Sequence, residues 1–386
     1  MKVIDIVDLF GSGYERGYQF GAARCEQIHR WVRAWHGSLA AAGIVDSPRY
    51  LDRMLRDTDF LPAIRAHGPE LLEEVQGIAD AVALSFDSLF AAQLMDEEWA
   101  YRSSVAQAGE MLQVRRDPMQ KCSSVAIADG DGRAWIGQNM DLGAYTDGHQ
   151  VLLRSGRADG RVQGRGGVDR ECQANTEGSL IFTIGGMLAL MGVNSRGLGV
   201  CVNSLPQLQF AREGVPVTFV IRKLLAAANV EDAVQTVCSL PHATGQHYLI
   251  ADANSVRSFE ASSSGVVEYH PSDPMRVLHT NHPLVHSEAH SSGDKSNSIA
   301  RLGSLTTRLM CGPQNLESVK AALSSSDDPL HPVCRVVESS SRANSITGTI
   351  NFTTGSMVSA LTRTAPIDCW VSKGPPRLRG YTRIDW

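Results

Sequence analysis

Apolar residues in the first third of the chain recur at the three-to-four-residue spacing of an amphipathic helix. In residues 14–42 the apolar positions that share one face are Ile28, Trp31, Val32, Trp35 and Leu39. A second stretch begins at Pro69, a residue that suits the first turn of a helix, and a third covers residues 86–102. Residues 1–8 indicate a first strand. The pattern therefore predicts that residues 1–110 are mainly helical.

After residue 121 the pattern changes to the two-residue alternation of strands. A tight turn at Asp129-Gly130-Asp131-Gly132 separates the first two strands. The expected strands are 124–128, 134–140, 179–184, 187–193, 198–204, 247–251, 256–260, 275–279, 346–352 and 357–362. The expected helices are 216–226, 230–238, 297–310 and 316–323, and residues 156–171 read as a loop. Strands, two helices and further strands favour stacked sheets with helices outside them, an α+β fold.

Composition excludes several classes of protein. The chain has 386 residues, 43% of them hydrophobic and 20% charged, as in an ordinary globular protein. Its formal charge of −5 is dispersed, with no basic stripe for nucleic acid and no apolar run long enough for a membrane. The N-terminus lacks the features of a signal peptide, so cytoplasmic residence is the default. Eight cysteines without a regular interval indicate neither a disulfide scaffold nor a zinc site.

One cysteine stands at a chemically special place. Cys122 begins a strand directly after a polar and charged loop, residues 113–121. A thiol there can attack the preceding carbonyl and cut the chain, which frees its own α-amino group. That amine has a pKa of about 7.7–8.0 and can act as general base for a thiol of pKa about 8.5. The alternative is a buried strand cysteine without a catalytic role.

Several separated motifs give the chain a family resemblance. Five segments are similar to the β-subunit of the acyl-coenzyme A:6-aminopenicillanic acid acyltransferases. They are Cys122-Ser123-Ser124, Gly137-Gln138-Asn139-Met140-Asp141, residues 192–203, His279-Thr280-Asn281-His282 and Ser341-Arg342. These are also called isopenicillin N acyltransferases, peptidase family C45. Upstream, Gly13-Tyr14-Glu15-Arg16-Gly17, residues 77–79 and residues 98–101 resemble the α-subunit. The motifs occur in order over nearly the whole chain.

The resemblance implies a fold and a processing event. It implies a four-layer αββα sandwich of the N-terminal nucleophile hydrolase type, cut between Lys121 and Cys122. Residues 1–121 would be the mainly helical α-subunit or pro-segment, and residues 122–386 the β-subunit with the nucleophile. Together they would form one αββα catalytic domain. The family typically has glycine before the nucleophile, and Lys121 departs from this because lysine does not share glycine's access to φ > 0. Cutting is therefore expected to be slower or absent.

The resemblance also assigns site residues. Asp141 would orient groups near the nucleophile; its alternative is a turn aspartate at a strand end. Asn281 would form the oxyanion hole, where an amide donor stabilises negative charge without titrating. Arg342 would pair with Asp141 or hold a substrate carboxylate, and Ser341 and Ser262 would contribute to substrate binding.

The sequence gives no reason to expect a cofactor. His279 and His282 have an HxxH spacing, but no third ligand pattern accompanies them, so a metal site is not expected. The glycine-rich stretches 164–167 and 185–186 lack the spacing and strand-to-helix context of a nucleotide fingerprint. Acyl-coenzyme A would be a substrate.

The leading hypothesis is a self-processing cysteine amidohydrolase or acyltransferase that acts on a small N-acyl amide through a thioester acyl-enzyme. Its partners would be that amide and the α and β fragments of one precursor, without nucleic acid or membrane. One alternative is acyl transfer from an acyl-coenzyme A thioester to an amine. An alternative of another class is an uncut, inactive binding protein of the same fold, which Lys121 favours.

Overall fold

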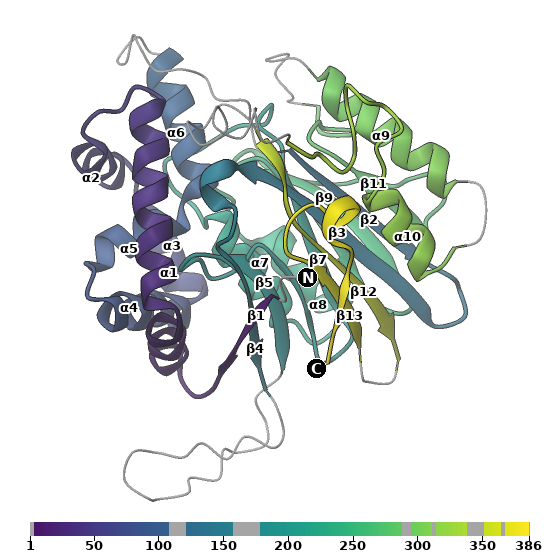
Figure 1. Ribbon diagram of the computed structural model, residues 1–386, viewed down its shortest axis with the longest axis horizontal. Coiled ribbons are helices and arrows are strands. Elements are labelled where there is room, and N and C mark those ends of the chain that lie inside the picture. The colour runs from purple at the N-terminus through teal and green to yellow at the C-terminus, as the bar shows by residue number, and fades with distance from the viewer. Residues whose placement is uncertain are drawn as a thin grey trace, which may run out of the picture.

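Two β-sheets stack face to face between two layers of helices in the computed structural model (Figure 1). The structure describes residues 4–107, 121–156, 178–287, 295–310, 314–337, 351–363 and 367–385. One sheet has eight strands in the order β1-β4-β5-β6-β7-β8-β9-β10, and the other has six in the order β11-β2-β3-β12-β13-β14. The expected α+β class and its αββα layering are confirmed.

The helices fall into two groups. Those beside the eight-stranded sheet are α1 (Gly13–Ala41), α2 (Ser47–Asp57), α3 (Phe60–His67), α4 (Pro69–Val82), α5 (Phe86–Gln93), α6 (Met95–Gln107), α7 (Val217–Leu225) and α8 (Val230–Ser239). The outer face of the six-stranded sheet carries α9 (Ser296–Leu309) and α10 (Leu316–Leu323). Two short elements complete the set, η1 (Ala144–Thr146) and α12 (Pro376–Arg379).

The strands of the eight-stranded sheet are β1 (Asp5–Leu9), β4 (Gln150–Ser155), β5 (Ser179–Ile184), β6 (Met191–Asn194), β7 (Gly199–Ser204), β8 (Gln246–Ala251), β9 (Val256–Ser262) and β10 (Gly265–Glu268). Those of the six-stranded sheet are β2 (Lys121–Ala128), β3 (Arg133–Gly143), β11 (Arg276–His279), β12 (Asn351–Thr362), β13 (Asp368–Ser372) and β14 (Thr382–Ile384). In β2 and β3, Cys122 lies opposite Met140, and Lys121 opposite Asp141.

Most of the expected elements are confirmed, and the differences have local causes. The helix expected over residues 86–102 is two helices, α5 and α6, separated at Leu94. The strand expected over 187–193 is only β6, because residues 185–190 turn between strands. The helices α2 and α3 and the strands β4, β10, β13 and β14 were not expected. The loop at 156–171 and the strand start at 346–350 lie almost wholly outside the described residues.

The core between the sheets explains why both faces of many strands are apolar. Side chains from one sheet reach the other: a Cβ on Gly199 of β7 would lie 2.6 Å from Ile136 Cγ2 of β3. A second core cluster, including Val125, Ile127 and Leu305, lies between the six-stranded sheet and α9 and α10. Burial of apolar area on both sides of each sheet stabilises the sandwich by roughly 25 cal/mol per Å².

Glycines of α1 set the close contact between α1 and α4. A Cβ on Gly17 would lie 1.9 Å from the Glu74 carbonyl oxygen, and one on Gly13 would lie 2.1 Å from Glu70 O. From the other side, a Cβ on Gly77 of α4 would lie 2.1 Å from Tyr14 O. The Gly13–Gly17 motif of the sequence is therefore explained by packing of two helix backbones.

Gly17→Ala is expected to lower the free energy of unfolding by about 1–3 kcal/mol, because the added methyl group pushes the two helices apart. Gly37, on the exposed side of the same helix, has no atom within 4 Å of its ideal Cβ position. Gly37→Ala is expected to raise the free energy of unfolding by about 0.5–1 kcal/mol. Urea unfolding of the two variants measures both, and equal effects would contradict this account.

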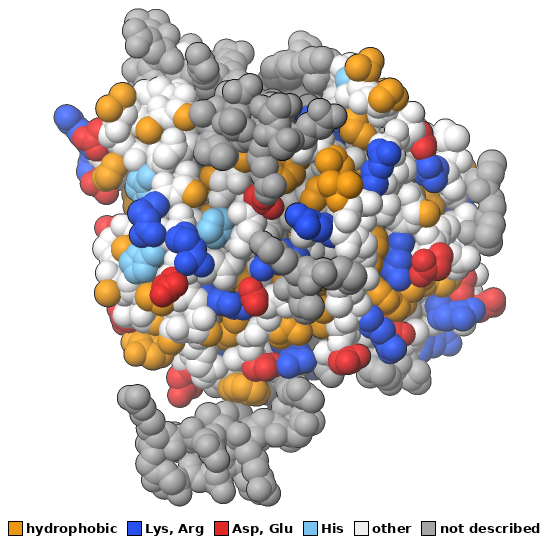
Figure 2. Space-filling view, viewed as in Figure 1, with side chains coloured by type: hydrophobic (Ala, Val, Ile, Leu, Met, Phe, Trp, Pro, Cys, Tyr) orange, Lys and Arg blue, Asp and Glu red, His pale blue; other side chains and the backbone are white. Residues whose placement is uncertain are grey.

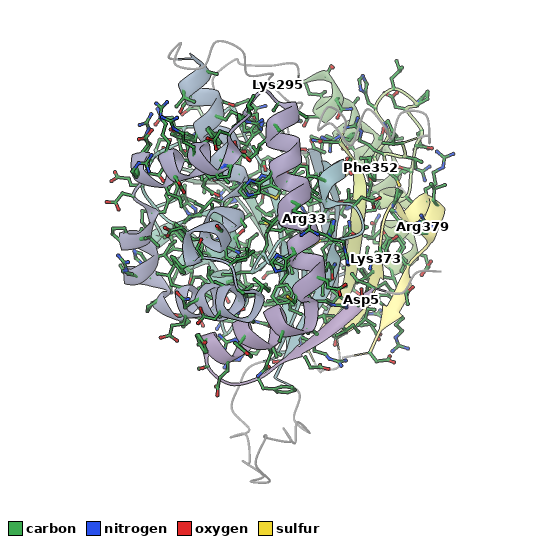
Figure 3. All side chains as sticks on the ribbon, turned by 60° about the vertical axis from the view of Figure 1, so that its left-hand side comes forward. Asp5, Arg33, Lys295, Phe352, Lys373 and Arg379 are labelled. Atoms are coloured by element: carbon green, nitrogen blue, oxygen red, sulfur yellow. The ribbon has the colours of Figure 1, made fainter. Side chains whose placement is uncertain are left out.

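Charges of both signs are interspersed over the face shown in Figure 2. An ion pair joins the two sheets, where Lys373 Nζ after β13 lies 3.2 Å from Asp5 Oδ2 of β1 (Figure 3). None of the described helices has the length and apolar character to cross a bilayer.

Candidate active site

Alternation along β2 directs Cys122 into the space between the sheets. Cys122, Ala126 and Ala128 belong to the core between the sheets, whereas Val125 and Ile127 face α9 and α10. Cys122 is 3% exposed, at the beginning of the strand. The alternation of side chains along β2 thus buries the Cys122 thiol between the sheets, beside the eight-stranded sheet.

The backbone of Cys122 is held on both sides by side chains distant in sequence. Its N–H donates to Asn281 Oδ1 at 2.7 Å, and its carbonyl accepts from Arg301 Nη1 at 2.6 Å. Arg301 Nη2 also donates to Asn281 Oδ1 at 2.8 Å. Cys122, Asn281 and Arg301 therefore form one hydrogen-bonded group.

Asn281 is fixed through its side chain and its backbone. Its Nδ2 donates to the Ser204 carbonyl at 3.0 Å, at the end of β7. Its backbone N–H donates to Ser298 Oγ at 2.7 Å, and its carbonyl accepts from Gln207 Nε2 at 3.2 Å. Since Oδ1 accepts from two donors, the amide has one defined orientation, with its Nδ2 directed to β7.

Arg301 of α9 is the site residue that sequence reasoning missed. It is fully buried, and its Nε donates to Asn297 Oδ1 at 3.0 Å while Nη1 also reaches Ser123 Oγ at 2.8 Å. Burial lowers the pKa of Arg301 to about 10, partly offset by the charge of Asp141. The guanidinium is therefore protonated at neutral pH.

A signal for Arg301 exists in the sequence. It falls on the same face of its helix as Leu305 and Leu309, which are four and eight residues further on and buried. A charged residue within an apolar stripe needs a partner, because an unpaired buried charge is costly. That pattern could have identified Arg301 as a functional or structural anchor.

The environment of the thiol favours its protonated form. Burial, followed by the charge of Asp141, raises the pKa of Cys122 to about 12, although a hydrogen bond from the Asp141 backbone opposes the rise. The Asp141 carboxylate is itself buried, and its Oδ1 accepts from Thr353 Oγ1 at 2.6 Å. In the uncut chain the nucleophile candidate is therefore a thiol that requires a base.

A small cavity adjoins Cys122. Its volume of about 20 Å³ provides room for about one water molecule. Its apolar lining comes from Met95, Met140, Met187, Leu190, Val202, Val217 and Ile221. Gln93, Asp96, Ser204 and Thr218 add polar groups. Asp96 Oδ2 accepts from Ser204 Oγ at 2.6 Å and from Gln246 Nε2 at 2.7 Å.

The other residues expected at the site are placed as follows. Ser262 lines a different, more open cleft of about 450 Å³, where its Oγ is 2.7 Å from Ser264 Oγ. Ser341 and Arg342 lie outside the described residues, so their roles stay predictions. Of Lys121, only the backbone in β2 is described. The structure thus brings together Cys122, Asp141 and Asn281 and adds Arg301.

Three solved structures have low similarity to this chain. The Caenorhabditis elegans N-acylethanolamine-hydrolyzing acid amidase ortholog is 13% identical, covers 64% of this chain and 94% of its own, and has a TM-score of 0.41. A mutant of the Clostridium perfringens conjugated bile acid hydrolase is 13% identical over 68% and 92%, with a TM-score of 0.42. Penicillin V acylase from Agrobacterium tumefaciens is 17% identical over 65% and 82%, with a TM-score of 0.32.

Comparison with curated proteins gives no match. A family model matches residues 128–366, more than half of the chain, and its description is acyl-coenzyme A:6-aminopenicillanic acid acyl-transferase. The match includes Asp141, Asn281 and Arg301 and begins after Cys122. The chain therefore belongs to the acyl-coenzyme A:6-aminopenicillanic acid acyl-transferase family and is an enzyme of amide-bond hydrolysis or N-acyl transfer.

Proposed function

We propose that the protein is a self-processing amidohydrolase whose nucleophile is the thiol of Cys122. The observation that carries the proposal is the hydrogen bond from Cys122 N to Asn281 Oδ1, in a buried group that also contains Arg301. A backbone N–H within a sheet is usually paired with a carbonyl of the neighbouring strand. Here a buried side chain holds the nitrogen that would become the catalytic amine.

Self-cleavage would proceed through two steps. Cys122 Sγ attacks the carbonyl carbon of Lys121, and the C–N bond breaks to give a thioester and a free Cys122 amine. Water then hydrolyses the thioester, which leaves a carboxylate on Lys121 and the thiol on Cys122. The new amine has an ordinary pKa of about 7.7–8.0, so it can take the thiol proton near neutral pH.

The residues around Cys122 would then have separate roles. Asn281 Oδ1 would accept an N–H of the amine and leave its lone pair available to the thiol. Asn281 Nδ2 has a second N–H besides the one directed to Ser204, and we assign it to the oxyanion. Arg301 would orient both Cys122 and Asn281, and Asp141 would hold the thiol through its backbone N–H.

The substrate would be a small N-acyl compound with an apolar acyl group. The cavity beside Cys122 is lined mainly by methionine and branched aliphatic side chains, and methionine adapts its shape to varied apolar groups. In the uncut chain this cavity has room for about one water molecule, too little for an acyl chain. We therefore expect the uncut form to be an inactive zymogen.

Acyl transfer is the second candidate, because the matching family is named for transfer from acyl-coenzyme A to an amine. The two functions differ in what resolves the acyl-enzyme. We expect hydrolysis of penicillin V, an N-acyl derivative of 6-aminopenicillanic acid, to continue unchanged when a competing amine is added. Capture of the acyl group by the amine in preference to water would favour transfer.

Intact mass spectrometry of the purified protein tests self-processing directly. We expect two polypeptides, residues 1–121 and 122–386, with Cys122 at the N-terminus of the second. A folded protein that remains one chain and cleaves no N-acyl amide would refute the proposal and support the uncut binding protein.

A further inference from the structure

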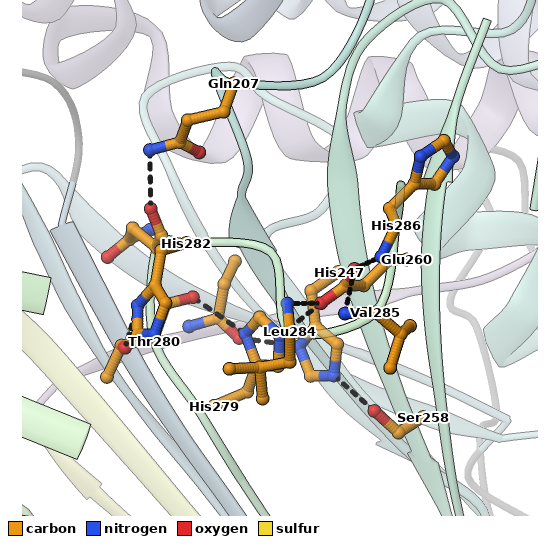
Figure 4. Close-up of polar contacts among 12 residues, drawn as sticks. Gln207, His247, Ser258, Glu260, His279, Thr280, His282, Leu284, Val285 and His286 are labelled. Atoms are coloured by element: carbon orange, nitrogen blue, oxygen red, sulfur yellow. Dashed lines mark hydrogen bonds and ion pairs between the residues drawn. The ribbon is translucent and has the colours of Figure 1, made fainter. Parts of the chain in front are cut away.

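One buried carboxylate closes the loop that carries Asn281. Glu260 of β9 is fully buried and lies 3.1 Å from His279 Nε2, at the end of β11 (Figure 4). The same carboxylate accepts the backbone N–H groups of Leu284 at 2.5 Å, Val285 at 3.2 Å and His286 at 2.8 Å. Asn281 lies between these two points of attachment, so Glu260 fixes the loop on both sides of it.

The contacts define the protonation states of the pair. His279 Nδ1 lies 2.8 Å from the Thr280 carbonyl oxygen, which can only accept, so Nδ1 carries a proton. Burial alone would raise the pKa of Glu260, but His279 and the backbone N–H groups outweigh burial and hold that pKa below its ordinary value. Glu260 is therefore a carboxylate, and His279 Nε2 donates to it.

A second histidine connects this ion pair to the strand of Cys122. His247 stacks on His279 with ring centroids 3.6 Å apart and planes at 7°. Its Nδ1 donates to Asn203 Oδ1 at 2.9 Å, and its Nε2 lies 2.8 Å from Ser258 Oγ. Burial holds the pKa of His247 well below its ordinary value, so the ring is neutral. Asn203 Oδ1 also accepts from Ser124 Oγ at 2.5 Å, two residues after Cys122 in β2.

We propose that Glu260, acting through His279, is a positioning residue that holds Asn281 in register with Cys122. The ion pair fixes the loop 279–286 to β9, and the stack on His247 fixes that same unit to β2 through Ser124. The inference rests on the proposed function, because Asn281 matters here only if Cys122 reacts. A positioning role predicts that Glu260 and Asn281 act as one unit in kinetics.

A buried ion pair is not needed for stability alone. Well-packed apolar side chains in the same volume are often equally or more stabilising than a buried salt bridge. An ionised carboxylate, however, can gather three successive N–H groups and a histidine at one point. The geometry therefore favours a role in shaping this loop.

A double-mutant cycle between Glu260→Gln and Asn281→Ala tests the proposal. The glutamine keeps the side-chain shape but loses the charge, so we expect self-cleavage of freshly translated full-length chain, and kcat for penicillin V, to fall about 10–100-fold with KM little changed. Asn281→Ala should cost about 10²–10³-fold. Adding Glu260→Gln to Asn281→Ala should cost nothing further, because the residue to be positioned is gone.

Glu74→Gln provides the matched control. Glu74 is also fully buried, and it pairs with Arg222 at 2.6 and 2.9 Å and with Arg16 at 3.3 Å. None of these three residues contacts Cys122, Asn281 or Arg301 within the described residues. Glu74→Gln should lower the unfolding midpoint but leave the cleavage rate of the folded protein unchanged. His279→Gln is the second variant if Glu260→Gln prevents folding, and it should show the same lack of additivity.

The outcomes separate the two proposals. Uncut wild-type protein without amidase activity, or an Asn281→Ala variant that cleaves as wild type does, overturns the proposed function. If Asn281→Ala cleaves slowly but Glu260→Gln cleaves at the wild-type rate, the positioning role of Glu260 is wrong and the proposed function stands. Additive losses in the double variant also overturn the positioning role, because they would place Glu260 in general stability.

Discussion

Cys122→Ala is expected to leave the purified protein as a single chain of 41.7 kDa with no measurable amidase activity. In the proposed mechanism the substitution removes the atom that attacks both the Lys121 carbonyl and the substrate, so the loss should exceed about 10³-fold in each reaction. Alanine should be accepted by the fold, because it removes only one buried sulfur atom. Intact mass and the rate of acyl release from penicillin V measure the two effects.

Cys201→Ala is the matched control for this variant. Cys201 lies on β7, is buried like Cys122, and burial raises the pKa of its thiol in the same direction. Its loss should change stability by a similar small amount and leave self-cleavage intact. If Cys201→Ala blocks cutting and Cys122→Ala does not, the assignment of the nucleophile is wrong.

The helix and strand pattern was predictable wherever burial followed a regular period. The helices α1 and α4 were expected from apolar positions three and four residues apart, and β5 from a short apolar run. The break at Leu94 was not, because no glycine or proline marks the boundary between α5 and α6. The glycines at 185–186 indicated a turn there, but residues 187–190 are as buried as a strand, so the hydrophobic pattern did not show that the next strand begins only at Met191.

The candidate site was only partly predictable, for a physical reason. Cys122 and Asn281 could be named from motifs, but their contact joins residues 159 positions apart, and spacing in one sequence does not report such contacts. The apolar face of its helix was a signal for Arg301, whereas Glu260 looked like an ordinary charged residue of a strand. Its burial depends on how the layers stack.

Ser262 was named from the resemblance, but the structure places it away from Cys122. The resemblance associated it with substrate, yet it lines a cleft that shares no residue with the cavity of Cys122. Its role stays a prediction. The neighbouring Glu260, two residues earlier on the same face of β9, instead reaches the loop of Asn281. In this strand the residue that contacts the Asn281 loop of the other sheet is therefore Glu260 and not Ser262.

Arg301→Met is expected to lower the free energy of unfolding by about 3–5 kcal/mol, because it leaves buried polar groups without this donor and removes a cation that interacts with the Asp141 carboxylate. The affected acceptors are Cys122 O, Ser123 Oγ and Asn281 Oδ1. Methionine fills much of the same volume without charge. Self-cleavage should also slow by at least about 10²-fold, since Cys122 and Asn281 lose the group that aligns them.

Arg308→Met on the same helix separates this effect from a general loss of helix charge. Arg308 pairs with Asp327, but both side chains are more than a third exposed, and surface pairs contribute about 0–1 kcal/mol. Urea unfolding should therefore show a loss several-fold larger for Arg301→Met than for Arg308→Met. Arg301→Lys should fall between them, because one ammonium group keeps the charge near Asp141 but cannot reach all three acceptors in the fixed geometry of a guanidinium. If all three variants unfold at the same urea concentration, the buried guanidinium does not hold Cys122 and Asn281 together.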